Sequence, residues 1–264
     1  MIRDAWSPDP AVLAGAVVAL ALYAQAWVRL RRRGRRAHPF LFATGVAVGA
    51  LAVVSPLDAV AEDQLSAHMA QHLLLGDVAP LLIVLGLRGP VSFFLLPPRA
   101  LRLAMRSAVL RRIGMALLRP EVSFTVWAGS LAAWHVPEAY DAALAHPALH
   151  AAEHASLFLG GLLLWTQIVD PTRRAHLSPG RRAMFGALAL LASMALSETL
   201  LSTAPLYDHY GGIADRPFGL TWASDQRVAA LLMTAEQLAT LGAAVGILLR
   251  SHVYRLEAEA GHPL

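Results

Sequence analysis

Long apolar segments separated by short polar ones run through most of the chain. A helix needs roughly 20 apolar residues to cross about 30 Å of hydrocarbon, so segments of that kind can be counted directly. We predict spans over residues 10–30, 38–54, 66–87, 121–136, 148–169, 182–203 and 224–249. The pattern therefore predicts an all-α fold, a polytopic membrane helix bundle with about seven transmembrane helices.

Composition supports the membrane class. Of the 264 residues, 56% are hydrophobic and 15% are charged, whereas soluble domains are about half apolar and about a quarter charged. No polar stretch is long enough for a soluble domain, so residues 1–264 are predicted to form a single integral membrane domain. Cysteine is absent, which excludes disulfides and thiolate metal sites. A bound metal would have to be held by histidine, methionine or carboxylate.

The basic charge is all arginine and falls in short clusters between the predicted spans. Clusters of 6, 7, 4 and 2 arginines lie on one side of the membrane, 19 together, against Arg3, Arg216 and Arg227 on the other. The positive-inside rule then predicts an outer amino terminus and a cytoplasmic carboxyl terminus. This topology accounts for the net charge of +4 without nucleic acid as a partner.

The amino-terminal end of the chain does not resemble a cleaved signal peptide. The first span follows a polar leader without a basic region and is too long for such a peptide, so we expect it to stay in the mature protein. In the arginine-rich stretch 88–119, Leu101, Met105, Val109 and Ile113 recur at helical spacing. That spacing predicts an amphipathic helix on the cytoplasmic membrane surface.

The histidines gather at the predicted outer ends of the spans. His68 and His72 stand at positions i and i+4, as do His150 and His154, and His135 closes the fourth span. Side chains four residues apart share one helix face, with Cβ atoms about 5–6 Å apart. Polar groups in spans are costly, so two such pairs at similar depth predict a metal site. Two further outer histidines, His146 and His209, fit hydrogen-bonded interfacial residues better.

Three carboxylates are predicted to lie deeper in the spans. Asp77, Glu198 and Glu236 either anchor the bundle by hydrogen bonding or form part of an ion or proton path. Met69 is about 100° around the helix from His68, so it is expected to face away from the histidines, and Met233 is expected to pack in the core.

Several motifs in order along the chain resemble one family. They are His68-Met69-x-x-His72-Leu-Leu, Trp134-His135-x-Pro137-x-x-Tyr140, His150-x-x-Glu153-His154, Tyr207-x-x-Tyr210 and Asp225-Gln226. Together they resemble the CtaG-type cytochrome c oxidase assembly factors of bacteria. The departures are Ala230, where the family pattern has glycine, and Met233-Thr234, where it has Met-Trp.

The resemblance implies an assembly role in the bacterial cell inner membrane, without catalysis, for a haem-copper cytochrome c oxidase. It implies copper handling at the outer face, with an oxidase subunit or a copper chaperone as partner. On this interpretation the metal ligands are His68, His72, His135, His150 and His154. Glu153 and Asp225 would orient them, since ligating histidines commonly donate their other ring N–H to a carboxylate. The ligand types leave zinc open beside copper.

Three alternatives from other classes stay open at this point. The pattern His150-x-x-Glu153-His154 also matches some zinc proteases, so a seven-span zinc-dependent membrane hydrolase is one of them. A haem-binding electron carrier would need axial histidines from two helices, such as His72 and His154. A proton- or ion-conducting protein would be built around the three deep carboxylates.

Overall fold

The computed structural model describes residues 6–32, 37–89, 91–172, 177–213 and 216–261, which form helices joined by turns. The helices are α1 (Pro10–Arg31), α2 (Pro39–Val54), α3 (Pro56–Asp63), α4 (Leu65–Leu73), α5 (Ala79–Gly86), α6 (Val91–Phe94), α7 (Pro98–Arg106), α8 (Ala108–Leu117), α9 (Pro120–Trp134), α10 (Pro137–Ala145), α11 (Pro147–Val169), α12 (Pro179–Ser202), α13 (Asp208–Gly211), α14 (Trp222–Gln237) and α15 (Ala243–Glu259). The π-helical segments η2 (Leu74–Val78) and η4 (Leu238–Gly242) join α4 to α5 and α14 to α15, and η3 (Pro217–Gly219) is a 3-10 turn.

Proline and capping residues set where the long helices begin. Proline occupies the first helical position of α1, α2, α9, α11 and α12, where no N–H group is needed. The Asp9 carboxylate accepts hydrogen bonds from the first backbone amides of α1, and the Ser178 hydroxyl caps α12 in the same way. The helix boundaries therefore follow from local sequence.

Each of the seven predicted spans coincides with a helix or with two helices joined by a π-helical segment. Within the described residues, four helical stretches are long and apolar enough to cross a membrane: Pro10–Arg31, Leu65–Gly86, Pro179–Ser202 and Trp222–Glu259. The bent pair α2 and α3, with 49° between its parts, makes a fifth. Helix α9 has only 15 residues, and Glu153 and His154 reduce the apolar character of α11. The seven-span topology and the side assigned to each terminus remain predictions.

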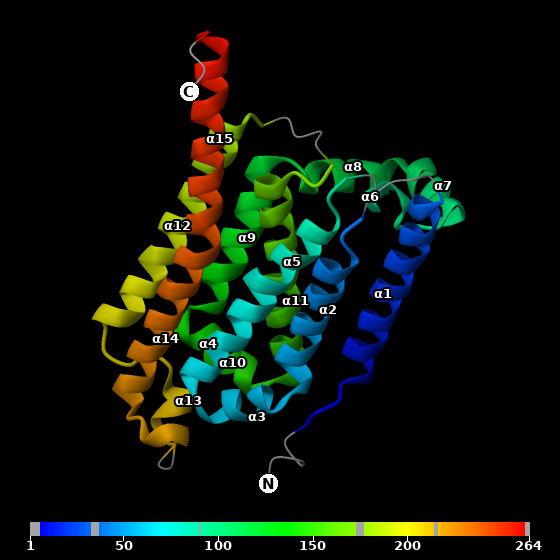
Figure 1. Cartoon of the computed structure of the whole chain (residues 1–264). Helices are drawn as coiled ribbons and strands as arrows, with labels where there is room; N and C mark the ends of the chain where they lie inside the picture. Colours follow the sequence, from blue (N-terminus) through cyan, green and yellow to red (C-terminus); the bar gives the residue numbers. More distant parts are fainter. Residues whose placement is uncertain (1–5, 33–36, 90, 173–176, 214–215, 262–264) are drawn as a thin grey trace.

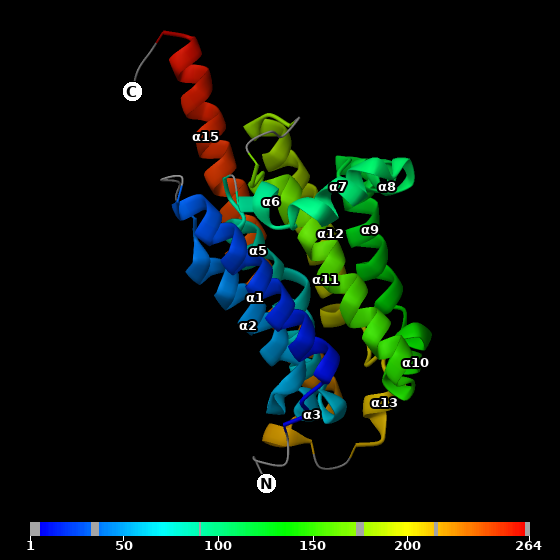
Figure 2. The same ribbon diagram turned by 90° about the vertical axis from the view of Figure 1, so that its right-hand side faces the viewer.

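The two ends of the bundle differ in character. The short helices α3, α10 and α13 lie at the end where α1 begins, whereas α7 and α8 run across the opposite end, beyond which α15 projects (Figures 1 and 2). Arginines gather on α7 and α8, among them Arg99, Arg102 and Arg111. The predicted basic residues at 33, 35, 36, 173 and 174 lie outside the described part of the chain.

The predicted surface helix is divided into α7 and α8. Ser107 ends α7 and its hydroxyl accepts a hydrogen bond from the Leu110 amide at the start of α8. The apolar side chains of Leu101, Met105 and Val109 are exposed. Exposed apolar residues among arginines fit a pair of helices lying on a membrane surface.

Glycine allows α11 to pack directly against the helical stretch that carries the first histidine pair. A Cβ atom added at Gly161 would overlap the carbonyl oxygen of Gly76, inside η2, and lie 2.9 Å from its carbonyl carbon. The preceding Gly160 makes a second close approach, to α9, where an added Cβ would lie 3.1 Å from the Cα atom of Trp127. The two helical stretches that bear the histidine pairs are therefore held at backbone contact.

Candidate metal centre

Hydrogen bonds from neighbouring elements hold helix α4 in place. The Asp225 carboxylate, on α14, accepts hydrogen bonds from the backbone amides of Leu65 at 2.8 Å and Ser66 at 3.0 Å. These amides are among those that a helix start leaves unpaired. Further along α4, the Gln71 side-chain amide donates to the Asp58 carboxylate at 2.7 Å. The orientation of α4, and hence of its two histidines, is set from both neighbouring elements.

Four side chains from α4 and α11 converge into one cluster. His68, His150, Glu153 and His154 each offer a ligand atom, and these atoms all lie within 4.8 Å of one another. The ring centroids of His68 and His150 are 5.3 Å apart, and those of His150 and His154 are 4.2 Å apart. We call these four residues the outer cluster. Three imidazoles and a carboxylate within such a distance are a donor set for a transition-metal ion.

Five candidate ligand atoms of the outer cluster have no hydrogen-bond partners among the described residues. The Nε2 atoms of His68, His150 and His154 are buried and unpaired, as are both carboxylate oxygens of Glu153. An unpaired buried polar group costs about 1–3 kcal/mol, and more if it is charged. His150 and His154 are partly exposed as residues, whereas His68 and Glu153 are buried. The arrangement is that of a site that gains stability when a cation enters it.

Tyr210 determines which nitrogen of His68 is free. The Tyr210 hydroxyl lies 3.0 Å from Nδ1 of His68 and donates its proton to the carbonyl oxygen of Ala61, also at 3.0 Å. Burial raises the pKa of Tyr210, so the hydroxyl keeps that proton at neutral pH. With its one proton directed to Ala61, the hydroxyl can only accept from His68. Nδ1 therefore carries the hydrogen, and the buried Nε2, which has no hydrogen-bond partner among the described residues, carries the lone pair.

Replacing Tyr210 with phenylalanine is expected to weaken metal binding about 10- to 100-fold, the usual effect of losing a partner that orients a histidine ligand. Titration of the purified protein against a metal chelator measures this affinity. Tyr254→Phe is the matched control, because Tyr254 is exposed on α15 and its hydroxyl accepts a hydrogen bond from Arg250. Equal affinity in the Tyr210→Phe variant and the wild type would remove Tyr210 from the site.

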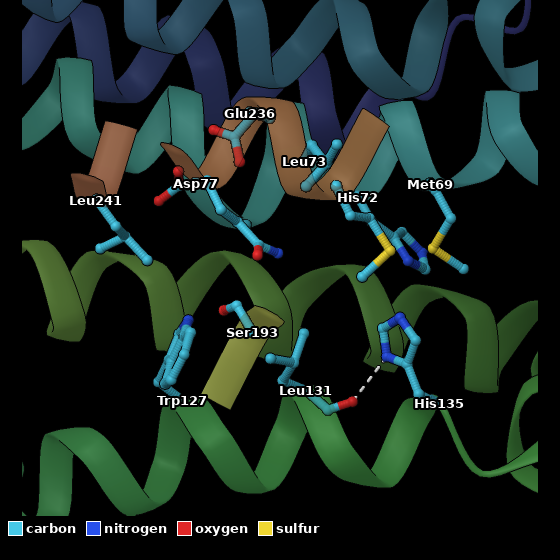
Figure 3. A pocket seen from close by; sticks show the side chains of 13 residues that line it. Met69, His72, Leu73, Asp77, Trp127, Leu131, His135, Ser193, Glu236 and Leu241 are labelled. Atoms are coloured by element: carbon cyan, nitrogen blue, oxygen red, sulfur yellow. Dashed lines mark hydrogen bonds between the residues drawn. The ribbon is translucent and has the colours of Figure 1, made fainter. Parts of the chain in front are cut away.

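The other two predicted histidines lie beside the outer cluster. Nε2 of His72 lies 3.6 Å from Oε1 of Glu153, and its ring centroid lies 4.3 Å from that of His68. His135, at the end of α9, donates from Nδ1 to the carbonyl oxygen of Leu131 at 2.8 Å. His72 and His135 face a shared cavity (Figure 3). The structure thus places three of the five predicted histidines in the outer cluster and two in the cavity next to it.

The two acidic residues expected to orient the histidines do different things. Glu153 has no exposed surface and belongs to the outer cluster itself, as a ligand candidate. Asp225 bonds backbone amides of α4 and positions His68 through the helix rather than through a ring nitrogen. The ring partner of His68 is Tyr210, which stands in a recognised motif but lies 142 residues away, so no spacing indicated the contact.

The cavity next to the outer cluster has a volume of about 60 Å³. Figure 3 shows Met69, His72 and His135 toward one end and Asp77 and Glu236 toward the other. Contrary to the expectation from sequence, Met69 lines the same cavity as His72. The two residues are three positions apart on α4, so both side chains can face the cavity that lies between them.

The deep carboxylates separate into a pair and an outlier. Asp77 accepts hydrogen bonds from the Trp165 indole and from the Thr240 hydroxyl, the latter at 2.6 Å. Glu236 lines the same cavity, and neither of its carboxylate oxygens has a hydrogen-bond partner among the described residues. Glu198 is exposed on α12 and takes no part in this group. Asp77 is therefore a hydrogen-bond anchor between α11 and η4, and an ion path through all three carboxylates is not formed.

His146 and His209 are hydrogen-bonded as predicted. A ring nitrogen of His146 lies 3.0 Å from the carbonyl oxygen of Ala142, and Nε2 of His209 lies 3.1 Å from that of Glu62. Both side chains are exposed, and neither joins the outer cluster.

The fold and the site define a helical protein with several membrane-length apolar helices and a buried imidazole–carboxylate cluster at one end of its bundle. The chain belongs to the cytochrome c oxidase caa3 assembly factor family (Caa3_CtaG), whose family model matches residues 21–254. This confirms the resemblance read from the motifs and makes the protein a cytochrome c oxidase assembly factor. No curated protein and no solved structure matches the chain.

Proposed function

We propose that this assembly factor handles copper for the oxidase, and that copper is a cargo bound by the outer cluster. The observation that carries the proposal is the convergence of four unpaired ligand groups within 4.8 Å, in a chain of an oxidase assembly family. Haem-copper oxidases require copper, and an assembly factor with a buried, partly accessible nitrogen-rich site is suited to holding it before transfer.

The donor set fits such a cargo. Imidazole and carboxylate bind Cu(II) well, although they suit zinc and nickel too, so the choice of copper rests on the family role. The carboxylate of Glu153 offsets part of the metal charge in a poorly solvated place. His68, His150 and His154 would bind through the Nε2 atoms that lack partners, and Tyr210 would hold the His68 ring in the required tautomer.

The proposed setting is the bacterial inner membrane, in which residues 1–264 form one integral domain of seven spans. The arginine distribution supports an orientation in which the end with the outer cluster is on the outer side of that membrane. There the cargo would pass between this protein and an oxidase subunit or a copper chaperone. Transfer of an ion makes and breaks only coordination bonds, so the proposal includes no enzymatic activity.

The hydrolase and haem alternatives receive less support from the geometry. The cavity that His72 lines, of about 60 Å³, is small for a haem beside the roughly 300–1,000 Å³ of sites for organic ligands and cofactors. In a zinc hydrolase Glu153 would act on a water beside a substrate, but its side chain is fully buried. A Glu153→Gln variant that keeps its metal and loses a hydrolytic turnover would favour the hydrolase.

The test uses a bacterium that lacks this protein and expresses a haem-copper oxidase. The strain is complemented with the wild type, with the outer-site variant (His150→Ala, His154→Ala) or with the control variant (His146→Ala, His209→Ala). We expect the outer-site variant to yield an oxidase with its haem but with little copper and little activity, partly restored by added copper. The readouts are copper per purified oxidase and oxygen consumption. Normal oxidase copper with the outer-site variant would contradict the proposal.

A further inference from the structure

The cavity beside the outer cluster is lined by a second group of metal-binding side chain types. Met69 and His72 come from α4, His135 from the end of α9 and Met233 from α14. Their exposed fractions are 1%, 7%, 8% and 2%. Two thioethers and two imidazoles, all at least nine-tenths buried, thus border one small space.

The imidazoles in this space have lone pairs without partners. Neither ring nitrogen of His72 is hydrogen-bonded within the described chain, and Nε2 of His135 is likewise unpaired and buried. Because Nδ1 of His135 donates to the Leu131 carbonyl, its Nε2 carries the lone pair. Figure 3 shows the His72 and His135 rings facing each other across the cavity, with the Met69 side chain beside His72.

Packing alone accounts for only part of this arrangement. Met69 and Met233 belong to a buried apolar cluster with Leu65, Tyr140 and Leu200, as core methionines often do. An apolar cluster gives no reason to place two unpaired imidazoles against the same methionines. Each unpaired nitrogen costs free energy that a bound cation would recover.

We propose that Met69, His72, His135 and Met233 form a second site, which binds a soft monovalent cation, namely Cu(I), for which Ag(I) can substitute. Thioether sulfur selects Cu(I) over zinc and other harder ions. None of the four ligands carries a negative charge, and the desolvation cost of an ion rises steeply with its charge, so a monovalent ion is favoured over a divalent one. At the other end of the cavity Asp77 already accepts hydrogen bonds from Trp165 and Thr240 and is not counted as a ligand.

His72 connects the second site with the outer cluster. Its Nε2 atom is 3.6 Å from Glu153, and its ring centroid is 5.4 Å from that of His154. A Cu(I) ion can therefore pass between the two sites, with no change of oxidation state, by exchanging ligands one at a time around His72. This inference rests on the proposed function, which names copper as the cargo. It deepens that function because it gives the oxidation state of the copper that enters the bundle as +1.

The test measures Ag(I) binding to the full-length protein in detergent, in the presence of saturating Zn(II). Zinc occupies the outer cluster but competes poorly for thioether sulfur. The methionine variant is Met69→Leu, Met233→Leu, which nearly conserves side-chain volume. Its matched control is Met184→Leu, Met194→Leu, since neither methionine lines the cavity. We expect one tightly bound Ag(I) in the wild type and the control, at least about tenfold weaker binding in the methionine variant, and unchanged zinc binding in all three.

X-ray absorption at the silver edge of the wild type gives a second readout that does not depend on variants folding. Sulfur in the silver coordination shell supports the second site, and a shell of nitrogen and oxygen alone overturns it. Absence of tight Ag(I) binding, or equal affinity in the methionine variant, also overturns it. Silver bound through sulfur in a protein that takes up neither zinc nor Cu(II) would uphold the second site while contradicting the outer-site function. Zinc bound without silver would do the reverse.

Discussion

Replacing His150 and His154 together with alanine is expected to lower the affinity of the purified protein for Cu(II) and Zn(II) at least about 100-fold, equivalent to about 2.8 kcal/mol. The two residues supply two of the four ligand groups that lie within 4.8 Å of one another. The remaining two, His68 and Glu153, come from different helices and cannot complete a four-ligand shell. Metal content after dialysis, followed by competition against a chelator, measures the loss.

The control for this result is His146→Ala, His209→Ala, which removes the same number of imidazoles from the same end of the bundle. Those rings already bond backbone carbonyls, so their removal should leave metal binding unchanged. Because His150 and His154 are partly exposed, their replacement should also leave the fold intact. Near-stoichiometric metal in both variants would show that the outer cluster is not the binding site.

The Gly161→Ala substitution is expected to destabilise the protein by about 1–3 kcal/mol, which is the usual cost of forcing extra volume into a packed core. The added Cβ would overlap the Gly76 carbonyl oxygen, and because that atom is backbone, no side chain can rotate away. Helix α11 must then shift from η2, which separates His150 and His154 from His68. Thermal unfolding in detergent and a metal titration should both register the change.

Gly129→Ala provides the comparison, since a Cβ at that position in α9 meets nothing within 4 Å. In a helix interior this change is expected to be neutral or slightly stabilising, because alanine has the higher helix propensity. If Gly161→Ala unfolds at the same temperature as Gly129→Ala and binds metal normally, the contact between α11 and η2 is not what holds the histidine pairs together.

Residues outside the outer cluster therefore hold the cluster in place. Asp225 bonds the start of α4, Tyr210 bonds His68, and Gly161 brings α11 to η2, while the ligand atoms stay unpaired. A rigid surrounding shell around unpaired donors keeps the ligands close to binding geometry without a metal.

Local sequence patterns were enough to predict the helices and the histidine pair on each of two helices. The apolar runs predicted where the long helices lie, because a helix in a membrane must satisfy all its backbone hydrogen bonds internally and so leaves a strong local signal. The i, i+4 spacing placed His68 with His72 and His150 with His154, because it depends only on helix geometry. The ordered motifs were sufficient to predict the family to which the chain belongs.

The tertiary structure alone decided which residues meet across helices. It placed Glu153 in the outer cluster, joined Tyr210 to His68 over 142 residues, and turned Asp225 toward the backbone of α4. It also turned Met69 toward the cavity that Met233 lines. None of these contacts produces a periodic pattern in the sequence. The rotation of each helix about its axis is fixed by packing against neighbouring helices, and the sequence of one helix does not specify that packing.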